Sequence, residues 1–302
     1  MLSIVVLGTA AGGGIPQWNC GCDNCSAARN GSPELIATQA SIAVSVDREH
    51  WFLINASPDL RQQIISAPVL HPKIGQLRHS PISGVVLTCG EIDAIAGLLS
   101  LREGTPFQLY AHERVLSLLG DNSVFNVLKP GIVGRHRISP DVPFEPMLGD
   151  GRQSGIEITP FIAPGKAALF IEEQSEYEDG DTLGFVLRDK GSGESLVFLA
   201  ACAAITPEIV DRLRGASLVF FDGTLWRDDE MIALGLSEKT GVRMGHTPMQ
   251  AAIAKLDGLE INRKLFIHIN NSNPTLQAGS VERKTAEAAG WQIPADGMEI
   301  NL

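Results

Sequence analysis

The apolar positions of the chain fall into two series of short segments that are typical of β-strands. The first series occupies residues 3–7, 40–46, 51–55, 85–87 and 108–111, and the second occupies residues 156–162, 182–188, 196–201, 217–222 and 264–267. Polar turns at 47–50 and 190–193 join neighbouring segments and predict two β-hairpins. The segment 217–222 is apolar over almost its whole length, which predicts a strand buried on both faces.

Helical spacing of apolar residues follows many of these strands. We expect helices at residues 60–65, 92–99, 115–119, 207–214, 245–256 and 281–289. Residues 125–151 are less periodic and rich in proline, which predicts an irregular excursion, and the acidic run 172–179 predicts a solvated loop. Because no linker separates the two series, the pattern predicts a single α/β domain over residues 1–302, a four-layer αββα sandwich with two sheets face to face.

The composition narrows the class of protein. The chain has 302 residues, of which 44% are hydrophobic and 20% charged, so it can bury a large core. Its formal net charge of -11 disfavours nucleic-acid binding, because such proteins normally present a basic face. No stretch approaches the roughly 20 apolar residues of a membrane span, and the N-terminus lacks the features of a signal peptide. We therefore expect a cytoplasmic protein without a membrane partner.

Three of the five cysteines form a compact C-x-C-x2-C cluster, Cys20, Cys22 and Cys25. In a cytoplasmic protein, closely spaced cysteines favour metal binding over disulfides. Thiolates are good zinc ligands, so the cluster predicts a structural zinc. The alternative is three reduced thiols at the surface. A tetrahedral ion needs a fourth ligand, which must come from elsewhere in the chain or be water.

A second group of candidate ligands follows the predicted strand 85–87. The chain breaks there into a polar turn and then a helix, and Cys89, Glu91 and Asp93 lie in or beside the turn. Such turns lie outside the carboxyl end of a sheet, where α/β proteins place their chemistry. The alternative is an ordinary strand-to-helix turn in which Asp93 complements the helix dipole.

Other polar residues occupy equivalent positions at strand ends. Asp222 and His268 end or follow the strands 217–222 and 264–267, and His246 opens a helix. We expect Asp93, His246 and His268 to line one pocket, with catalytic roles for all three and for Asp222. Histidine and carboxylate ligands together suit zinc or iron(II). For Asp222, a purely structural turn carboxylate is an equally good interpretation.

The turn at 88–97 also carries a family resemblance. Its frame T-x-x-x-x-D-x-x-x-G resembles the metallo-β-lactamase signature T-H-x-H-x-D-H-x-x-G, although Cys89, Glu91 and Ala94 stand at the three histidine positions. Longer strings extend the resemblance to the PqqB family of pyrroloquinoline quinone (PQQ) biosynthesis proteins, which have the metallo-β-lactamase fold. These strings are GTAAGGGIPQWNCGCDNC from residue 8, NASPDLR from 55, GLLSLREG from 97, FDGTLWRDDEM from 221, MGH from 244 and HINNSNP from 268.

The resemblance implies a cytoplasmic step in making PQQ from a peptide precursor that contains Glu and Tyr. One implied function is a metal-dependent oxygenase or hydroxylase step on the tyrosine-derived ring, and the alternative is a carrier or transport factor for PQQ or its precursor. A phosphodiesterase or nuclease is disfavoured, because the H-x-H pair is missing. A homodimer is a further expectation.

In the family picture, Asp93, the residue at position 94 and His268 hold an active-site iron(II) or zinc. Ala94 offers no ligand atom, so Cys89, Glu91 or His246 must supply the third ligand, or the site binds metal weakly. In a more distant branch of the superfamily, the fourth ligand of the three-cysteine zinc corresponds to Asn271, an amide that is a poor zinc ligand.

The carrier alternative calls for basic groups that would bind the carboxylates of PQQ. Arg61, Arg102 and Arg243 are the candidates, because the family strings place them near strand ends.

Overall fold

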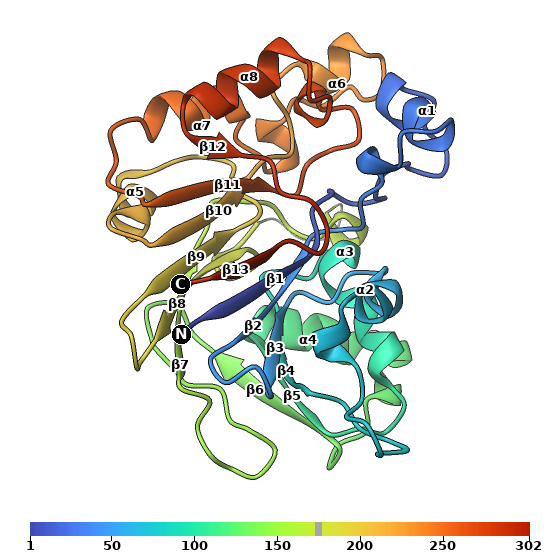
Figure 1. Ribbon diagram of the computed structural model, residues 1–302, viewed down its shortest axis with the longest axis vertical. Coiled ribbons are helices and arrows are strands. Elements are labelled where there is room, and N and C mark those ends of the chain that lie inside the picture. The colour runs from blue at the N-terminus through green and yellow to red at the C-terminus, as the bar shows by residue number, and fades with distance from the viewer. Residues whose placement is uncertain (173–176) are drawn as a thin grey trace.

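The computed structural model describes residues 1–172 and 177–302, and its strands form two sheets that lie face to face (Figure 1). The first sheet has the strand order β13-β1-β2-β3-β4-β5-β6. Its strands are β1 (Ser3–Gly8), β2 (Ser41–Ser45), β3 (Trp51–Ile54), β4 (Ile82–Val86), β5 (Phe107–His112), β6 (Val133–Ile138) and β13 (Glu299–Asn301).

The second sheet has the strand order β12-β11-β10-β9-β8-β7. Its strands are β7 (Ile156–Ile162), β8 (Leu183–Asp189), β9 (Ser195–Leu199), β10 (Leu218–Asp222), β11 (Arg263–Ile267) and β12 (Trp291–Gln292). Both sheets are mixed: β3 to β6 and β9 to β12 are parallel, and the remaining neighbours are antiparallel. The hairpins predicted at 47–50 and 190–193 are the β2–β3 and β8–β9 connections.

Helices cover the outer face of each sheet. The helices of the described residues are α1 (Asp23–Arg29), α2 (Leu60–Ser66), α3 (Ile92–Ile95), α4 (Glu113–Asp121), α5 (Pro207–Leu213), α6 (Glu230–Ala233), α7 (Met249–Lys255) and α8 (Val281–Ala288). Helices α2, α3 and α4 lie against the first sheet, and α5, α7 and α8 lie against the second (Figure 1). This arrangement confirms the predicted four-layer αββα sandwich. None of the described helices combines the length and apolar character that a membrane crossing requires.

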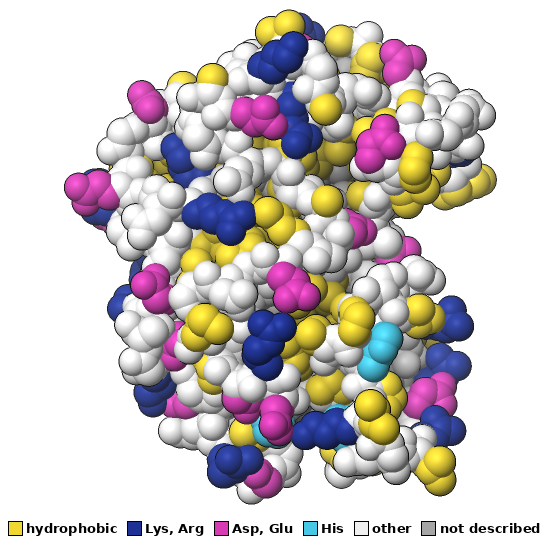
Figure 2. Space-filling view, in the orientation of Figure 1, with side chains coloured by type: hydrophobic (Ala, Val, Ile, Leu, Met, Phe, Trp, Pro, Cys, Tyr) yellow, Lys and Arg dark blue, Asp and Glu magenta, His cyan; other side chains and the backbone are white. Residues whose placement is uncertain are grey.

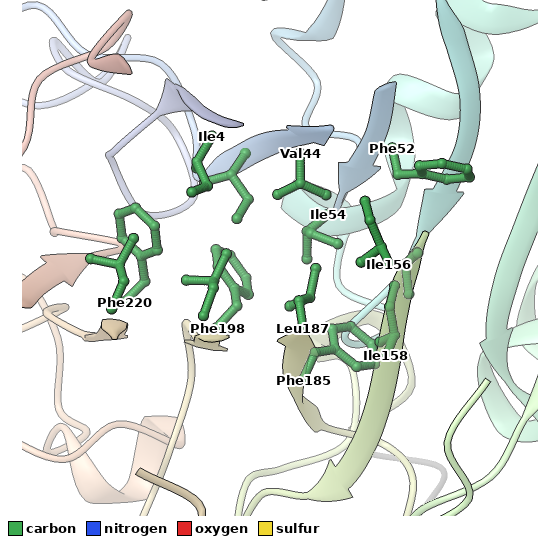
Figure 3. Packing of buried hydrophobic residues seen from close by; sticks show 14 of the residues in the cluster. Ile4, Val44, Phe52, Ile54, Ile156, Ile158, Phe185, Leu187, Phe198 and Phe220 are labelled. Atoms are coloured by element: carbon green, nitrogen blue, oxygen red, sulfur yellow. The ribbon is translucent and has the colours of Figure 1, made fainter. Parts of the chain in front are cut away.

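The main core lies between the two sheets. Ile4, Val44 and Ile54 of the first sheet face Phe185 and Phe198 of the second (Figure 3), and each is at most 1% exposed. Burial of one such side chain contributes about 1.5–3 kcal/mol. The alternate residues of the same strands pack outward against the helices, so strands such as β10 are buried on both faces and read as continuous apolar runs.

Three predicted segments differ from the structure. The helix expected at 245–256 begins only at Met249, because Gly245 has a left-handed φ of 92° and Pro248 is the N-cap, so His246 lies in the loop before α7. The helix expected at 92–99 is α-helical only over Ile92–Ile95 and continues as a 3-10 helix over Ala96–Leu101. The N–H of Gly97 donates to the carbonyl of Ala56, which lies outside this helix.

The excursion expected at 125–151 contains the edge strand β6, in which exposed Arg135 and Arg137 alternate with half-buried Gly134 and His136. Of the acidic run 172–179, residues 173–176 lie outside the described part, so the loop prediction is untested there.

Gly97 is required by a close backbone approach. A Cβ atom at this position would lie 2.1 Å from the carbonyl oxygen of Ser57. We expect Gly97→Ala to lower the free energy of unfolding by about 2 kcal/mol or more, because backbone on one side must move. Gly120 in α4 is the matched control, since a Cβ there meets no atom within 4 Å and Gly120→Ala should be neutral or slightly stabilising. Chemical denaturation measures the free energy of unfolding of both variants. Equal stability of the two would contradict the close backbone approach as the reason for Gly97.

Candidate functional site

The candidate site lies where strands from both sheets end. The turn after β4 leads to Asp93 at the start of α3, β10 ends at Asp222, and His268 directly follows β11. In the parallel β10–β11 pair, Asp222 is opposite Ile267. His268, the next residue after Ile267, therefore lies close to Asp222. The face-to-face packing of the sheets then brings Asp93 to His268 across 175 positions of sequence.

The backbone around the site is held in defined conformations. Asn55 accepts hydrogen bonds at one side-chain oxygen from the backbone N–H of Thr88, at 2.9 Å, and from its hydroxyl, at 3.0 Å. Both Asn55 and His268 have left-handed backbone angles, with φ of 65° and 61°. Such angles are uncommon for residues other than glycine, although asparagine and histidine adopt them more readily than most, and they recur at functional sites where surrounding contacts hold them.

Asp93 and His268 form a direct pair, with Oδ2 and Nε2 2.8 Å apart. Burial by itself raises the pKa of the Asp93 carboxyl, but the hydrogen bond and the charge of His268 outweigh burial and lower that pKa. Burial lowers the pKa of His268, yet the hydrogen bond and charge of Asp93 outweigh it and raise that pKa. Each group therefore favours the charged form of the other.

Thr224 connects the other polar residues. Its hydroxyl lies 2.8 Å from Oδ1 of Asp222, 3.0 Å from Nδ1 of His246 and 2.8 Å from Nδ1 of His268. The imidazole of His246 also lies 2.9 Å from Oδ2 of Asp222, and the two histidine rings stack with centroids 5.2 Å apart. These contacts engage Nδ1 of both rings and so fix the ring orientations, and Nε2 of His268 is the atom that contacts Asp93.

Asp222 is completely buried and hydrogen-bonded by the surrounding loops. Its carboxylate accepts from the backbone N–H of Cys202 at 3.0 Å and from that of Thr224 at 3.1 Å. The structure thus favours a positioning role for Asp222, in which it orients His246 and the loop after β10.

The two remaining candidate ligands of the turn have other environments. Desolvation, followed by the negative charges of Asp93 and Glu91, raises the pKa of the Cys89 thiol to about 12. The carboxylate of Glu91 pairs with the ammonium group of Lys166 and accepts the backbone N–H of Leu169 at 3.1 Å. A metal at these residues would have to displace a proton from Cys89 or the cation from Glu91.

The site opens into a cavity of about 850 Å³. The methyl group of Ala94 lines this cavity, so space lies where the family motif has an imidazole. Of the described residues that line the cavity, Lys166 and Lys239 are the ones with a lysine or arginine side chain. The expected Arg61, Arg102 and Arg243 are not part of this lining, because proximity to a strand end does not fix the direction of a side chain.

The residues of the candidate site fit a metal ion in their donor chemistry. One ligand atom each from Asp222, His246 and His268 lies within 4.8 Å of the others, and Asp93 reaches His268 directly. Oxygen and nitrogen ligands lie about 2.0–2.2 Å from zinc, so ligands sharing one ion are roughly 3 Å apart, close to the Asp93–His268 distance. Ala94 contributes no donor, so Asp93 and His268 are what remains of the ligand set that the family motif implies, and Asp222 and His246 are further donors beside His268.

The three-cysteine cluster is also assembled by the fold. The sulfur atoms of Cys20, Cys22 and Cys25 lie within 4.8 Å of one another, and burial raises the pKa of the Cys22 thiol to about 11. The amide nitrogen of Asn271 lies 3.0, 3.5 and 3.3 Å from the three sulfurs in that order. Asn271 therefore occupies the fourth corner of the cluster, and a half-turn of its amide would direct an oxygen toward an ion held by the thiolates.

The fold and this site define a protein of the metallo-β-lactamase class. Residues 50–269 match the family model of the beta-lactamase superfamily domain. The chain is 59% identical to coenzyme PQQ synthesis protein B of Bradyrhizobium diazoefficiens, with 100% of each chain covered. It is 51% identical to the protein of the same name from Gluconobacter oxydans, with 100% of this chain and 99% of the other covered. The chain belongs to the coenzyme PQQ synthesis protein B family.

Solved structures agree with this assignment. The crystal structure of Zn(2+)-bound PqqB from Methylobacterium extorquens has a TM-score of 0.94 and 45% identity, with 99% of this chain and 100% of that chain covered. A diphosphatase of the PhnP family shares the fold, with a TM-score of 0.69 at 21% identity over 99% of this chain and 96% of the other.

Sequence reasoning missed Thr224, Lys166 and Lys239. Thr224 follows Asp222 by two residues, so the D-G-T string was a usable signal for a hydroxyl near the site. The two lysines lie in loops far from the recognised motif, and only the packed fold brings them to the cavity.

The first metal prediction concerns the cysteine cluster. Cys22→Ser removes one thiolate, so we expect loss of bound zinc and a lower thermal midpoint, because a structural zinc contributes directly to folding. Zinc content by mass spectrometry and thermal unfolding measure both effects.

Cys202→Ser is the matched control for this variant. Cys202 is buried, and its thiol donates to the carbonyl of Ala204 outside the cluster, so the substitution should leave the zinc content unchanged. Wild-type protein purified without zinc, or a Cys22→Ser variant as stable as the wild type, would refute the structural zinc.

Proposed function

We propose that the chain acts in PQQ biosynthesis as a metal-dependent hydroxylase of the tyrosine-derived ring of the precursor. The observation that carries the proposal is the Asp93–His268 pair opening into a cavity of about 850 Å³. Its support is membership in a family whose members are named for PQQ synthesis, one of them solved with bound zinc. Cavities of this size commonly enclose small-molecule ligands.

The residues of the site have distinct roles in this proposal. Asp93 and His268 would hold the metal, and Thr224 would orient the ring of His268 through Nδ1. Asp222 would hold His246 against the same cluster. Bound iron(II) would supply the reductive activation of O2 that ring hydroxylation requires.

The cavity combines this polar end with apolar walls. Phe170, Met231 and Met244 are among its lining residues, beside Leu169 and Leu225. Aromatic and thioether side chains make favourable contacts with an aromatic ring. They would hold the tyrosine-derived ring at the polar end and limit the access of water to it.

A second candidate function is a carrier for PQQ or its precursor. Ala94 favours it, because a pocket that lacks one imidazole of the family's ligand set has a lower metal affinity while keeping its shape. The carrier and the hydroxylase need the same cavity and differ in whether a metal must be present.

Metal binding separates these functions. We expect the unmodified chain to hold close to one tight ion, at the cysteine cluster, and to bind iron(II) weakly at Asp93 and His268. Ala94→His should strengthen this second binding by about 10-fold or more, because it restores a carboxylate and two imidazoles around one ion. Calorimetric titration of iron(II) under anaerobic conditions measures the change.

The matched control is the double variant Ala94→His with His268→Ala, which adds one imidazole and removes another and should return to weak binding. Tight iron(II) binding by the unmodified chain would contradict the expectation and assign Cys89 or Glu91 as a ligand. If Ala94→His gains no affinity, the carrier function becomes the better proposal.

A turnover experiment tests the hydroxylase directly. The purified chain, loaded with iron(II) and supplied with ascorbate and ¹⁸O2, is incubated with a Glu- and Tyr-containing precursor peptide. We expect one ¹⁸O atom per hydroxylation of the ring, the second oxygen atom leaving as water, and loss of at least about 100-fold in rate for Asp93→Asn because a ligand is removed. Mass spectrometry detects the label. An unlabelled product, or equal rates for the two proteins, would rule out hydroxylation at this site.

A further inference from the structure

The cavity carries two cations that the metal site does not use. Lys166 and Lys239 are 24% and 42% exposed, so both ammonium groups remain reachable by a ligand. Their placement in the cavity contrasts with the net charge of -11 for the whole chain, which repels an anionic ligand elsewhere.

Lys166 lies close to the polar end of the cavity. Its ammonium group pairs with Glu91 and donates to the carbonyl of Ala167 at 3.3 Å. Its side chain passes Gly245, where a Cβ atom would lie 3.5 Å from Cγ of Lys166. Because Gly245 directly precedes His246, this cation lies beside the histidine cluster.

Lys239 is held by a similar pair. Its ammonium group lies 3.1 and 3.2 Å from the two carboxylate oxygens of Glu172. Between Lys166 and Glu172 along the chain, Leu169 and Phe170 line the cavity while being 65% and 39% exposed. The two ion pairs therefore border an apolar surface that no other part of the described chain fully covers.

We propose that Lys166 and Lys239 are specificity-determining residues that bind two carboxylates of the ligand, with its ring against Leu169 and Phe170. This inference rests on the proposed function, since PQQ is an aromatic tricarboxylate. Each lysine is already oriented by a glutamate, so a ligand carboxylate meets an ordered cation and costs little additional side-chain entropy. The ligand carboxylate joins or replaces the glutamate at each ammonium group.

The two members of an ion pair should then have opposite effects on binding. Removing a lysine removes an attraction for the ligand, whereas neutralising its glutamate removes a competing anion. A purely structural role of the pairs predicts the same sign for both changes, because either change breaks the pair. The sign of the glutamate variant therefore distinguishes recognition from structural support.

The experiment measures binding of PQQ to the full-length protein by calorimetry. We expect Lys166→Met and Lys239→Met each to weaken binding by about 10-fold, the range of a hydrogen-bonded charge contact. Glu172→Gln should strengthen binding by about 2- to 5-fold, since a partly exposed ion pair is worth up to roughly 1 kcal/mol. Thermal unfolding of each variant verifies that the fold is retained.

Lys190 provides the matched control. It pairs with Glu145 at 2.6 Å, and neither residue lines the cavity. Lys190→Met and Glu145→Gln therefore make the same two changes in an ion pair outside the cavity and should leave the affinity for PQQ unchanged. The trimethyl ester of PQQ keeps the ring system and lacks the negative charges. It should bind the wild type as weakly as PQQ binds the double lysine variant.

The outcomes separate this inference from the proposed function. If the wild type binds PQQ and the lysine variants bind it equally well, carboxylate recognition by these residues is overturned while the proposed function stands. Weaker binding by Glu172→Gln, or equal affinity for PQQ and its ester, overturns the inference in the same way. If the wild type binds neither PQQ nor the precursor peptide, the proposed function itself fails.

Discussion

The packing of the two inner sheet faces is the constraint on which the site depends. Phe185, Phe198 and Phe220 interlock with aliphatic side chains of the first sheet and hold the sheets at a fixed separation and angle (Figure 3). The Asp93–His268 contact joins one residue from each side of that interface, so its 2.8 Å distance is set by the core rather than by local sequence. A substitution in the core would therefore change the Asp93–His268 distance even though no residue of the site is replaced.

The loop after β11 connects the two candidate metal centres. His268 at its start belongs to the cavity, and Asn271 three residues later reaches the cysteine cluster. The side chain of Asn24, which lies beside that cluster, donates to the carbonyls of Asn271 and Asn273 at 2.9 Å each. A zinc ion held by the thiolates would thus stabilise the same loop that holds His268 in its left-handed conformation.

The charges of the molecule are organised differently inside and outside the cavity. On the face seen in Figure 2, the described Lys and Arg side chains are interspersed with Asp and Glu, so no continuous basic surface is present there for a nucleic acid. Inside the cavity, Lys166 and Lys239 are held in place by acidic partners. The position of charge, rather than its sum, decides what this site attracts.

The sequence by itself determined most of the strands and helices, the αββα class and the cysteine cluster, because these follow from periodicity and from ligands that are neighbours in the chain. It did not give the edge strands β6, β12 and β13, which are short or polar and lack a clear apolar pattern. It also placed Asp93 and His268 at strand ends that meet. Only the tertiary structure decided that Thr224 links both histidine rings, that Asn271 lies at the fourth corner of the cysteine cluster and that Lys166 and Lys239 enter the cavity. These contacts join loops far apart in sequence, and their side-chain directions are fixed by the packing of the sheets, which no local pattern encodes.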